Sequence, residues 1–327
     1  MNPFQFERSS SSSEAILRMG KNSRAKFIGG GTNLIDLMKE GVESSDFLLD
    51  VNHVGMNEVL ELPGGRIRIG ASVTNSDAAY SGLVEERFPL LRDAILAGAS
   101  PQLRNMATCG GNLLQRTRCY YFYDLATACN KRENGSGCDA IAGNNRIHAL
   151  FGASDACIAV HPSDMCVALA TLNAEIHVLG PNGPRVIRIA DFHRLPGNDP
   201  TRDNTLSRDE LIIAIELPPS PLNHHYHYAK VRDRSSYAFA LISAAVGMNL
   251  EAGKIQSASI AMGGVAHKPW RDSRAEKLLI GKRPEIRVFR DFSEAFFKSA
   301  RGLGHNNFKI ELGKRTLVRA LEEASLK

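Results

Sequence analysis

Residues 102–115 have the sequence QLRNMATCGGNLLQ, and residues 157–165 have the sequence CIAVHPSDM. The first stretch is typical of a nucleotide-binding loop, because glycines and small polar residues let backbone N–H groups approach an anion. The second is typical of a helix start, with Ser163 and Asp164 as the expected cap. Between them lies CYYFYDLATACNKRENGSGCDAIAGNNRIHALFGASDAC, residues 119–157, which is too polar and glycine-rich to be core.

This long segment carries four of the six cysteines of the chain, which favours a functional insert over a disordered one. Loops longer than about 12–15 residues inside a compact domain are usually one or the other. The four cysteines are separated by nine, eight and eighteen residues, which matches no common ferredoxin pattern. By spacing alone, four thiolates would suggest a structural zinc. Cys109 and Cys166 stand beside apolar residues and are expected to be buried small hydrophobes.

The composition is that of a soluble globular protein. A chain of 327 residues is long for one core, so two or three domains are expected. The net charge of +5 is scattered, without a basic stripe interleaved with aromatic residues, which favours a solvated surface over a nucleic-acid interface. No apolar run approaches the ~20 residues that span a bilayer. The first twenty residues lack the apolar core and cleavage site of a signal peptide, so we expect no export signal in this chain. Without one, a disulfide framework is disfavoured.

The first 219 residues predict two successive α+β units, with turn and cap residues at their boundaries. The first unit, to about residue 55, is βαβ-like. A cluster of prolines after the last strand of the second unit is the expected domain boundary. The expected strands are 4–8, 25–28, 46–52, 59–62, 66–73, 174–180, 185–189 and 209–217, and the expected helices are 14–21, 34–39, 88–100 and 164–172.

Beyond the prolines, antiparallel strands are predicted at 225–233 and within 240–265, with a turn at 252–254. Two helices, roughly 285–303 and 311–326, should close the chain. The class is therefore α+β and not a doubly wound parallel sheet. The predicted domains are 1–219, with subdomains of about 1–55 and 56–219 and an insert at 116–157, followed by 220–327.

Two glycine loops are the main chemical signals. The first, GGGTN at residues 29–33, lies between a predicted strand and a predicted helix. Neither GxGxxG nor GxxxxGK[ST] is present, which excludes a Rossmann or P-loop interpretation. Alone, this glycine run is about as consistent with a plain tight turn as with a phosphate-binding loop. The second loop, TCGGN at residues 108–112, adds another glycine pair. Two such loops could hold both halves of a diphosphate.

Taken together, KFIGGGTNL, QLRNMATCGGN, HPSDM, KVRDRSSYAFA and GGVAHKPWR, in this order, resemble the flavin-binding subunits of the molybdenum hydroxylases. This is the family of xanthine dehydrogenase and carbon monoxide dehydrogenase. The resemblance runs from about residue 3 to the C-terminus. It implies a vanillyl-alcohol-oxidase-type FAD-binding domain of two subdomains, followed by a small C-terminal α+β domain.

The resemblance also implies a set of residues that bind FAD. The first loop would line the pyrophosphate, the second would complete its site, Asp164 would hydrogen-bond the cofactor, and Ile212 and Lys230 would lie beside it. The implied set is Lys26, Phe27, Ile28, Gly29, Gly30, Gly31, Thr32, Asn33, Leu34, Thr108, Gly111, Asn112, Gln115, Asp164, Ile212 and Lys230.

Two residues near this set have alternative interpretations. A lysine could stabilise the negative charge that a reduced flavin gains, but a surface cation is an equal alternative for Lys230. Tyr237 could stack on the ring, although a core tyrosine is favoured. No histidine or cysteine attachment site is recognised, so we expect non-covalent FAD.

The insert limits the members of the family that the chain resembles, because only some of them carry it. It is similar to that of the flavin subunits of bacterial periplasmic aldehyde oxidoreductases, with the subunit of hydroxybenzoyl-CoA reductase as the second choice. In both, the loop binds a [4Fe–4S] cluster. The resemblance therefore implies that Cys119, Cys129, Cys138 and Cys157 ligate such a cluster and that Cys109 and Cys166 do not.

The other histidines have unremarkable interpretations. His224, His225 and His227 precede or begin a predicted strand; solvated side chains are favoured there over a metal site. His161, before Pro162, is expected to be structural. No Ser/His/Asp set with a nucleophile signature is present, so hydrolysis has no support.

The function implied by the resemblance is electron transfer, with no catalytic residue on this chain. Substrate would be oxidised at a molybdenum cofactor on a large subunit. Electrons would then pass through [2Fe–2S] clusters of a small subunit to the FAD held here, and leave to an external acceptor. A stand-alone flavin oxidase and a non-redox scaffold remain alternatives. The resemblance implies export to the periplasm with a partner of a three-subunit complex, with the cytoplasm as the alternative.

Overall fold

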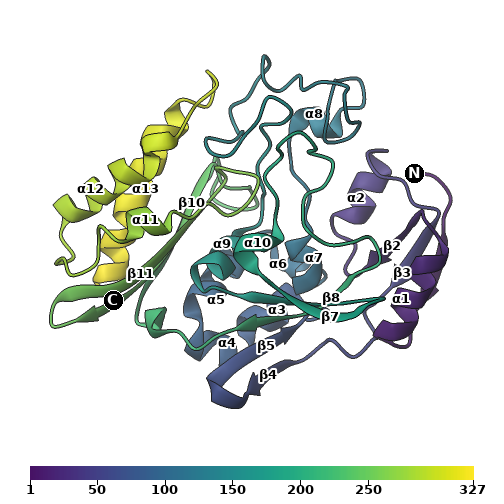
Figure 1. The fold of residues 1–327 in the computed structure, drawn as a ribbon, viewed down its shortest axis with the longest axis horizontal. Coiled ribbons are helices and arrows are strands. Elements are labelled where there is room, and N and C mark those ends of the chain that lie inside the picture. The colour runs from purple at the N-terminus through teal and green to yellow at the C-terminus, as the bar shows by residue number, and fades with distance from the viewer.

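The first 55 residues form a small parallel sheet with the order β1-β3-β2. The computed structural model describes residues 1–327 (Figure 1). The side chain of Ser11 caps the first helix by accepting a hydrogen bond from the backbone N–H of Glu14 at 3.2 Å. The βαβ-like unit predicted from the sequence is confirmed. Its elements are β1 (Gln5–Arg8), α1 (Ser12–Lys21), β2 (Ala25–Ile28), α2 (Leu34–Lys39) and β3 (Phe47–Asp50).

The second unit is a five-stranded antiparallel sheet with the order β4-β5-β8-β6-β7. Both predicted hairpins are present, and the second turns more tightly than expected, because β7 already begins at Gly183. Its strands are β4 (Val59–Leu62), β5 (Arg66–Gly70), β6 (Glu175–Gly180), β7 (Gly183–Arg188) and β8 (Leu211–Leu217). Its helices are α3 (Asn75–Tyr80), α4 (Gly82–Arg87), α5 (Pro89–Ala97), α6 (Pro101–Arg104), α7 (Cys109–Leu113), α9 (Asp164–Thr171) and α10 (Ile189–Phe192).

The C-terminal unit is a three-stranded antiparallel sheet with the order β11-β10-β9. Two long helices cover one face of this sheet, and α9 of the second unit packs against the sheet as well (Figure 1). The first of these helices ends at Phe296, seven residues earlier than expected, because the chain tightens into a 3-10 turn at Phe297–Ser299. The elements are β9 (His225–Val231), β10 (Ile242–Glu251), β11 (Lys254–Gly263), α11 (Ser273–Glu276), α12 (Ile286–Phe296) and α13 (Phe308–Ser325).

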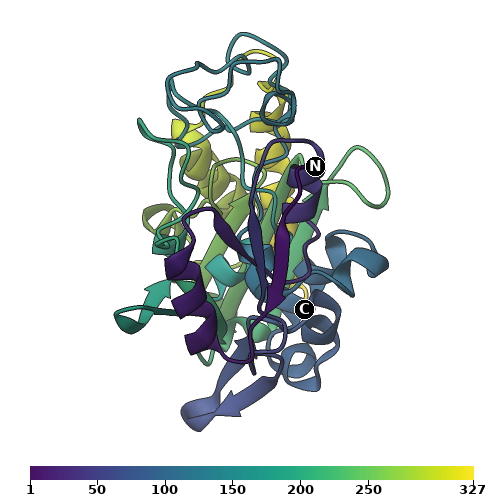
Figure 2. The same ribbon diagram turned by 90° about the vertical axis from the view of Figure 1, so that its right-hand side faces the viewer.

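The cysteine insert, residues 116–157, has little regular structure beyond α8 (Tyr120–Tyr123). It arches between the N-terminal sheet and the C-terminal helices in both views (Figures 1 and 2). On one side, the Tyr123 hydroxyl donates to Asp36 of α2 at 3.1 Å. On the other side, Leu150 and Phe151 are part of the C-terminal hydrophobic core. The insert therefore connects the N-terminal unit to the C-terminal unit.

The two remaining cysteines lie in the main core of the second unit. Cys109 and Cys166 are both fully buried among apolar side chains, as the sequence predicted. Burial raises the pKa of each of these two thiols to about 12. None of the helices is long and apolar enough to cross a membrane.

Candidate functional site

Both glycine loops line one cavity of about 1320 Å³. Every residue that the sequence predicted for the flavin site lines it. Its walls come from the loop between β2 and α2, from α7, from the start of α9 and from residues 230–239 of the C-terminal unit. The structure thus brings together residues that are more than two hundred positions apart in the sequence.

The two glycine loops pack directly against each other. A Cβ atom on Gly30 would overlap the backbone carbonyl of Met106, and one on Gly29 would come within 2.7 Å of the Thr108 hydroxyl. Gly31 has a φ of 70°, a conformation that favours glycine. Glycine is therefore required at position 30 for the contact between the loops, a cause that the sequence did not reveal.

The second loop is ordered by its own hydrogen bonds. Thr108 caps α7 and accepts from the Gly111 N–H at 3.2 Å. The Asn112 carbonyl oxygen of the side chain accepts from Gln115 at 2.9 Å and from Ser163 at 2.5 Å. These bonds connect α7 to the cap of α9, so the loop has its shape before any ligand arrives.

Asn33 links the first loop to the cysteine insert and also offers a free donor. Its Oδ1 accepts from the backbone N–H of Arg116 at 2.9 Å. Its Nδ2 is buried and has no hydrogen-bond partner. Buried polar groups are nearly always paired, so an orphan amide on a cavity wall is a donor available to a ligand oxygen.

Asp164 and Lys230 form a buried ion pair at 2.8 Å, with side chains only 8% and 5% exposed. The other Asp164 oxygen accepts from the Tyr228 hydroxyl at 2.6 Å, and Lys230 also donates to the Ala97 carbonyl at 3.0 Å. Burial, followed by the Asp164 charge, raises the pKa of Tyr228 well above its usual value. Lys230 is therefore no surface cation, and that alternative is wrong.

Tyr237 corrects a second expectation. It is 54% exposed and lines the cavity, so it is not a core tyrosine. Its backbone has a φ of 49°, which for a residue with a Cβ costs about 1–2 kcal/mol. The Arg234 guanidinium lies 5.4 Å from the centre of its ring.

The four cysteines of the insert meet around a second, small cavity. Cys119, Cys129 and Cys157 are buried and Cys138 is partly exposed. Cys129 and Cys138 face each other in an isolated antiparallel bridge. Burial raises the pKa of Cys119 to about 12 and that of Cys157 to about 11. The structure therefore gathers the four residues that the resemblance selected and leaves Cys109 and Cys166 elsewhere.

A buried charged cluster forms the wall between the two cavities. Asp203 accepts from Arg116 at 2.8 Å and from Lys131 at 2.6 Å. Arg116 and Asp203 line the larger cavity, whereas Lys131 and Phe122 line the cysteine cavity. The Arg116 guanidinium lies 4.7 Å from the centre of the Phe122 ring. Pairs of side chains in direct contact, one from each cavity lining, therefore separate the two cavities.

Sequence reasoning missed this cluster, because its members come from two loops without periodicity. Burial opposes ionisation of Asp203, but Lys131 and Arg116 together lower the pKa of its carboxyl to about 2. The only signal in the sequence was the basic character of QRTR and CNKR on either side of the first insert cysteine.

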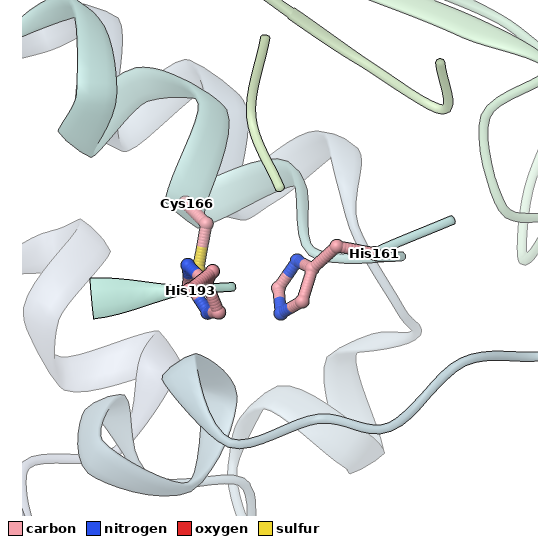
Figure 3. Close-up of side chains that lie close together, drawn as sticks. All are labelled: His161, Cys166 and His193. Carbon is pink, nitrogen blue, oxygen red and sulfur yellow. The ribbon is translucent and has the colours of Figure 1, made fainter. Parts of the chain in front are cut away.

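Figure 3 shows a third cluster, His161, Cys166 and His193, at the start of α9. The His193 Nε2 lies 2.8 Å from the Leu113 carbonyl, and the Ser163 N–H donates to the His161 Nδ1 at 3.4 Å. Burial lowers the pKa of His193 to about 4, so its ring is neutral. The His193 contact joins the end of α10 to the end of α7, and the His161 ring, just before α9, packs with its centre 4.2 Å from that of His193, in agreement with the structural role expected for His161.

His224, His225 and His227 belong to no cluster of metal-ligating atoms. His224 is exposed, as expected for a solvated side chain. His225 and His227 lie within β9 and are half-buried, because β9 pairs with β10 along their length.

Comparison with known families defines the class of protein. Residues 2–220 match the FAD binding domain in molybdopterin dehydrogenase, and residues 224–324 match the CO dehydrogenase flavoprotein C-terminal domain. The chain therefore belongs to the FAD-binding subunits of the molybdenum hydroxylases, which are oxidoreductase components. The predicted family and the predicted α+β architecture are both confirmed.

Alignments to individual relatives cover almost the whole chain. The chain is 46% identical over 325 residues to the aldehyde oxidoreductase FAD-binding subunit PaoB of Escherichia coli K12, with 99% of each chain covered. It is 26% identical to the carbon monoxide dehydrogenase medium chain of Afipia carboxidovorans, covering 98% of this chain and 96% of that one.

Solved structures give the same result. Reconstituted CO dehydrogenase from Oligotropha carboxidovorans matches with a TM-score of 0.77 and 25% identity, covering 100% of this chain and 99% of that one. Quinoline 2-oxidoreductase from Pseudomonas putida 86 shares the fold, with a TM-score of 0.77, 22% identity and coverage of 99% and 98%.

Proposed function

We propose that this chain is the FAD- and [4Fe–4S]-binding electron-transfer subunit of a molybdenum-containing aldehyde oxidoreductase. The observation that carries the proposal is the meeting of four insert cysteines at a small cavity whose lining contacts the lining of the predicted flavin cavity. The aldehyde assignment is supported by the 46% identity to a subunit of that name. In the proposed complex, substrate is oxidised at a molybdenum cofactor on a large subunit, and a small subunit carries [2Fe–2S] clusters.

The residues around the larger cavity fit FAD. Backbone N–H groups of residues 29–33, at the start of α2, and of residues 108–112, at the start of α7, would hold the pyrophosphate. The unpaired Nδ2 of Asn33 would supply a further donor. The Asp164–Lys230 pair would lie beside the cofactor, with each charge already neutralised by the other. When bound, FAD would accept electrons from the [2Fe–2S] clusters and release them to an external acceptor.

The spacing of the cysteine sulfurs favours a cluster over zinc. Tetrahedral zinc, with Zn–S distances of about 2.3 Å, holds its sulfur ligands about 3.8 Å apart. No three of the cysteine sulfurs in this chain lie within 4.8 Å of one another. A cubane distributes its four cysteine ligands over four separate irons, which requires the wider spacing. The four thiolates would come from Cys119, Cys129, Cys138 and Cys157.

A stand-alone flavin oxidase has less support. Such an enzyme needs a free general base facing the flavin. Three acids of the cavity are each paired with a cation: Asp164 with Lys230, Asp203 with Arg116, and Glu43 with Lys26 at 2.8 Å. The exposed Asp36 accepts a hydrogen bond from the Tyr123 hydroxyl. A hydroxybenzoyl-CoA-reductase-like complex would use the same cofactors in this chain and differ in its partners. A scaffold that binds both groups without electron transfer would leave their closeness unexplained.

Co-purification tests the proposal. A tagged copy of this chain, expressed from its own genomic neighbourhood, should bring down two further subunits. One should contain molybdenum, and the complex should oxidise aldehydes with a dye as acceptor. Acid precipitation should release the flavin into the supernatant. Recovery of the chain alone, with activity as an oxidase, would contradict the proposal.

We also propose that the complex folds in the cytoplasm and is exported to the periplasm with a partner that carries the signal. The proposal is supported by the resemblance of the insert to the periplasmic enzymes. Fractionation of cells that express the chain with and without its partners tests it. Periplasmic recovery of this chain without partners, or cytoplasmic residence of the whole complex, would contradict it.

A further inference from the structure

Two buried histidines contact the sulfur atoms of two insert cysteines. His148 Nε2 lies 3.1 Å from the Cys119 Sγ, and His267 Nε2 lies 3.3 Å from the Cys157 Sγ. Their exposed fractions are 1% and 7%. Neither imidazole is among the residues proposed to bind the flavin or the cluster.

The C-terminal unit fixes both histidines. His267 follows β11, in the segment GGVAHKPWR. The backbone carbonyl of His148 accepts hydrogen bonds from the Lys309 Nζ at 2.8 Å and from the Asn306 Nδ2 at 3.3 Å. Lys309 lies on α13 and Asn306 just before it. The C-terminal unit therefore holds both histidines against the cysteine sulfurs, although none of its residues lines the cysteine cavity itself.

The hydrogen-bonding environment assigns the proton on each ring. The Nδ1 atom of His267 is buried and lacks a hydrogen-bond partner. A proton on Nδ1 would leave a buried donor unpaired, which is rarer in proteins than an unpaired acceptor. A proton on Nε2 leaves only a lone pair unsatisfied and directs the N–H at the sulfur, so the Nε2–H tautomer is favoured for His267. The ring of His148 has the Asn145 backbone carbonyl as a further neighbour, but a metal-bound thiolate has no proton to donate, so a hydrogen bond between His148 and the Cys119 thiolate also requires the proton on Nε2.

We propose that His148 and His267 donate hydrogen bonds to the Cys119 and Cys157 thiolates and thereby raise the reduction potential of the cluster; this rests on the cluster assigned in the proposed function. Hydrogen bonds to cluster sulfurs are among the factors that set the potential. Reduction adds negative charge to the cluster, so the donors stabilise the reduced form more than the oxidised form. Both residues act through the ligands as positioning groups.

The test compares leucine and glutamine variants of each histidine in the assembled complex. Leucine removes the donor, whereas glutamine carries an amide N–H near the position of Nε2. The midpoint potential of the cluster is measured by a redox titration followed by low-temperature EPR. His224→Leu, at an exposed position, is the matched control.

The proposal expects His267→Leu and His148→Leu each to lower the midpoint potential. A tenfold loss of preference for the reduced form corresponds to about 59 mV for one electron. The glutamine variants should recover most of this shift, and the control should not move. A potential that is equal in wild type and in both leucine variants would overturn the proposal.

Metal content separates this inference from the proposed function. Wild-type protein without iron on this chain overturns the cluster and the inference together. Iron retained with an unmoved potential overturns the inference alone. If a leucine variant loses its iron, retention by the glutamine variant supports donation, and loss from both variants overturns it.

Discussion

The two cavities of this protein are built in opposite ways. The larger one is lined by backbone from two glycine loops that lead into short helices, and the second loop is ordered by hydrogen bonds of its own. The cysteine cavity is made of side chains on a segment with one four-residue helix. Its apolar cluster has 8 buried residues, against 38 in the main core, too few to fold the insert alone. We infer that the larger cavity forms without its ligand, whereas the insert depends on buried charges, the C-terminal unit and the cluster proposed above.

Gly30→Ala should have the largest effect on FAD binding. Its Cβ would overlap the Met106 carbonyl, so one or both glycine loops must move. Overpacking of this kind costs about 1–3 kcal/mol, and the displaced loops should lose most of their FAD. Flavin content after gel filtration and thermal unfolding measure both effects. Gly82→Ala, with nothing within 4 Å of its Cβ, is the control and should leave both unchanged.

Gly111→Ala sharpens the same point. Its Cβ would lie 3.0 Å from the Thr108 hydroxyl, which is tight but not an overlap. A smaller loss of flavin than for Gly30→Ala is expected. Equal loss of flavin from the two variants would contradict the claim that Gly30 is needed for the contact between the loops. A shared need for close backbone approach to the pyrophosphate would then explain why both positions are glycine.

Lys309→Met should destabilise the folded insert while leaving the two glycine loops intact. The Lys309 ammonium is fully buried and donates to three carbonyls, of Ile147, His148 and Gly264. Leaving these acceptors unpaired should cost at least about 3 kcal/mol. Limited proteolysis should then cut within residues 116–157, with flavin content near wild type. Lys298→Met, at an exposed position, should behave as wild type.

Acid should weaken the wall between the cavities through Asp203. The pKa of this carboxyl is lowered to about 2 in the folded protein, against about 4 when unfolded. A lowered carboxyl pKa stabilises the fold above pH 4, and this stabilisation, about 2–3 kcal/mol, is lost as the pH falls towards 2. Thermal melts of wild type and Asp203→Asn at pH 6 and pH 2.5 measure it. The difference between the two proteins should shrink at the lower pH; an unchanged difference would show that the ion cluster does not contribute.

Asn33→Asp should have the smallest effect. The substitution keeps the Oδ1 that accepts from Arg116 and replaces the unpaired amide donor by a second acceptor. We expect about a tenfold loss of FAD affinity, about 1.4 kcal/mol, without loss of the fold. Fluorescence titration of the apoprotein measures it, with the exposed Asn182→Asp as control. Unchanged affinity would show that the Asn33 amide does not contact the cofactor.

The sequence predicted the main regular elements well, because they follow from local patterns, and the residues that the resemblance selected for a flavin site line one cavity. The alternation in β9–β11 and the caps at Ser11 and Ser163 are visible in single stretches. The surface-cation alternative for Lys230 and the core interpretation of Tyr237 failed because the exposure of both side chains depends on long-range packing, which no local pattern encodes.

The sequence could not predict the surroundings of the cysteines. Arg116, Lys131 and Asp203 are ordinary charged residues in loops, and only the folded chain brings them together. His148 and His267 lie 119 positions apart, and nothing near either one in the sequence marks it as a neighbour of a cysteine. Long-range polar contacts of this kind have no periodicity to read.

Metal analysis of the cysteine insert tests the central claim most directly. The complex is purified anaerobically, and iron and zinc are counted per chain after subtracting the iron of the partner subunits. The account predicts about four irons on this chain, the content of one [4Fe–4S] cluster. This iron should be lost in Cys138→Ala and kept in Cys166→Ala, whose thiol is buried in the main core. One zinc and no iron would contradict the cluster while leaving the flavin cavity untouched.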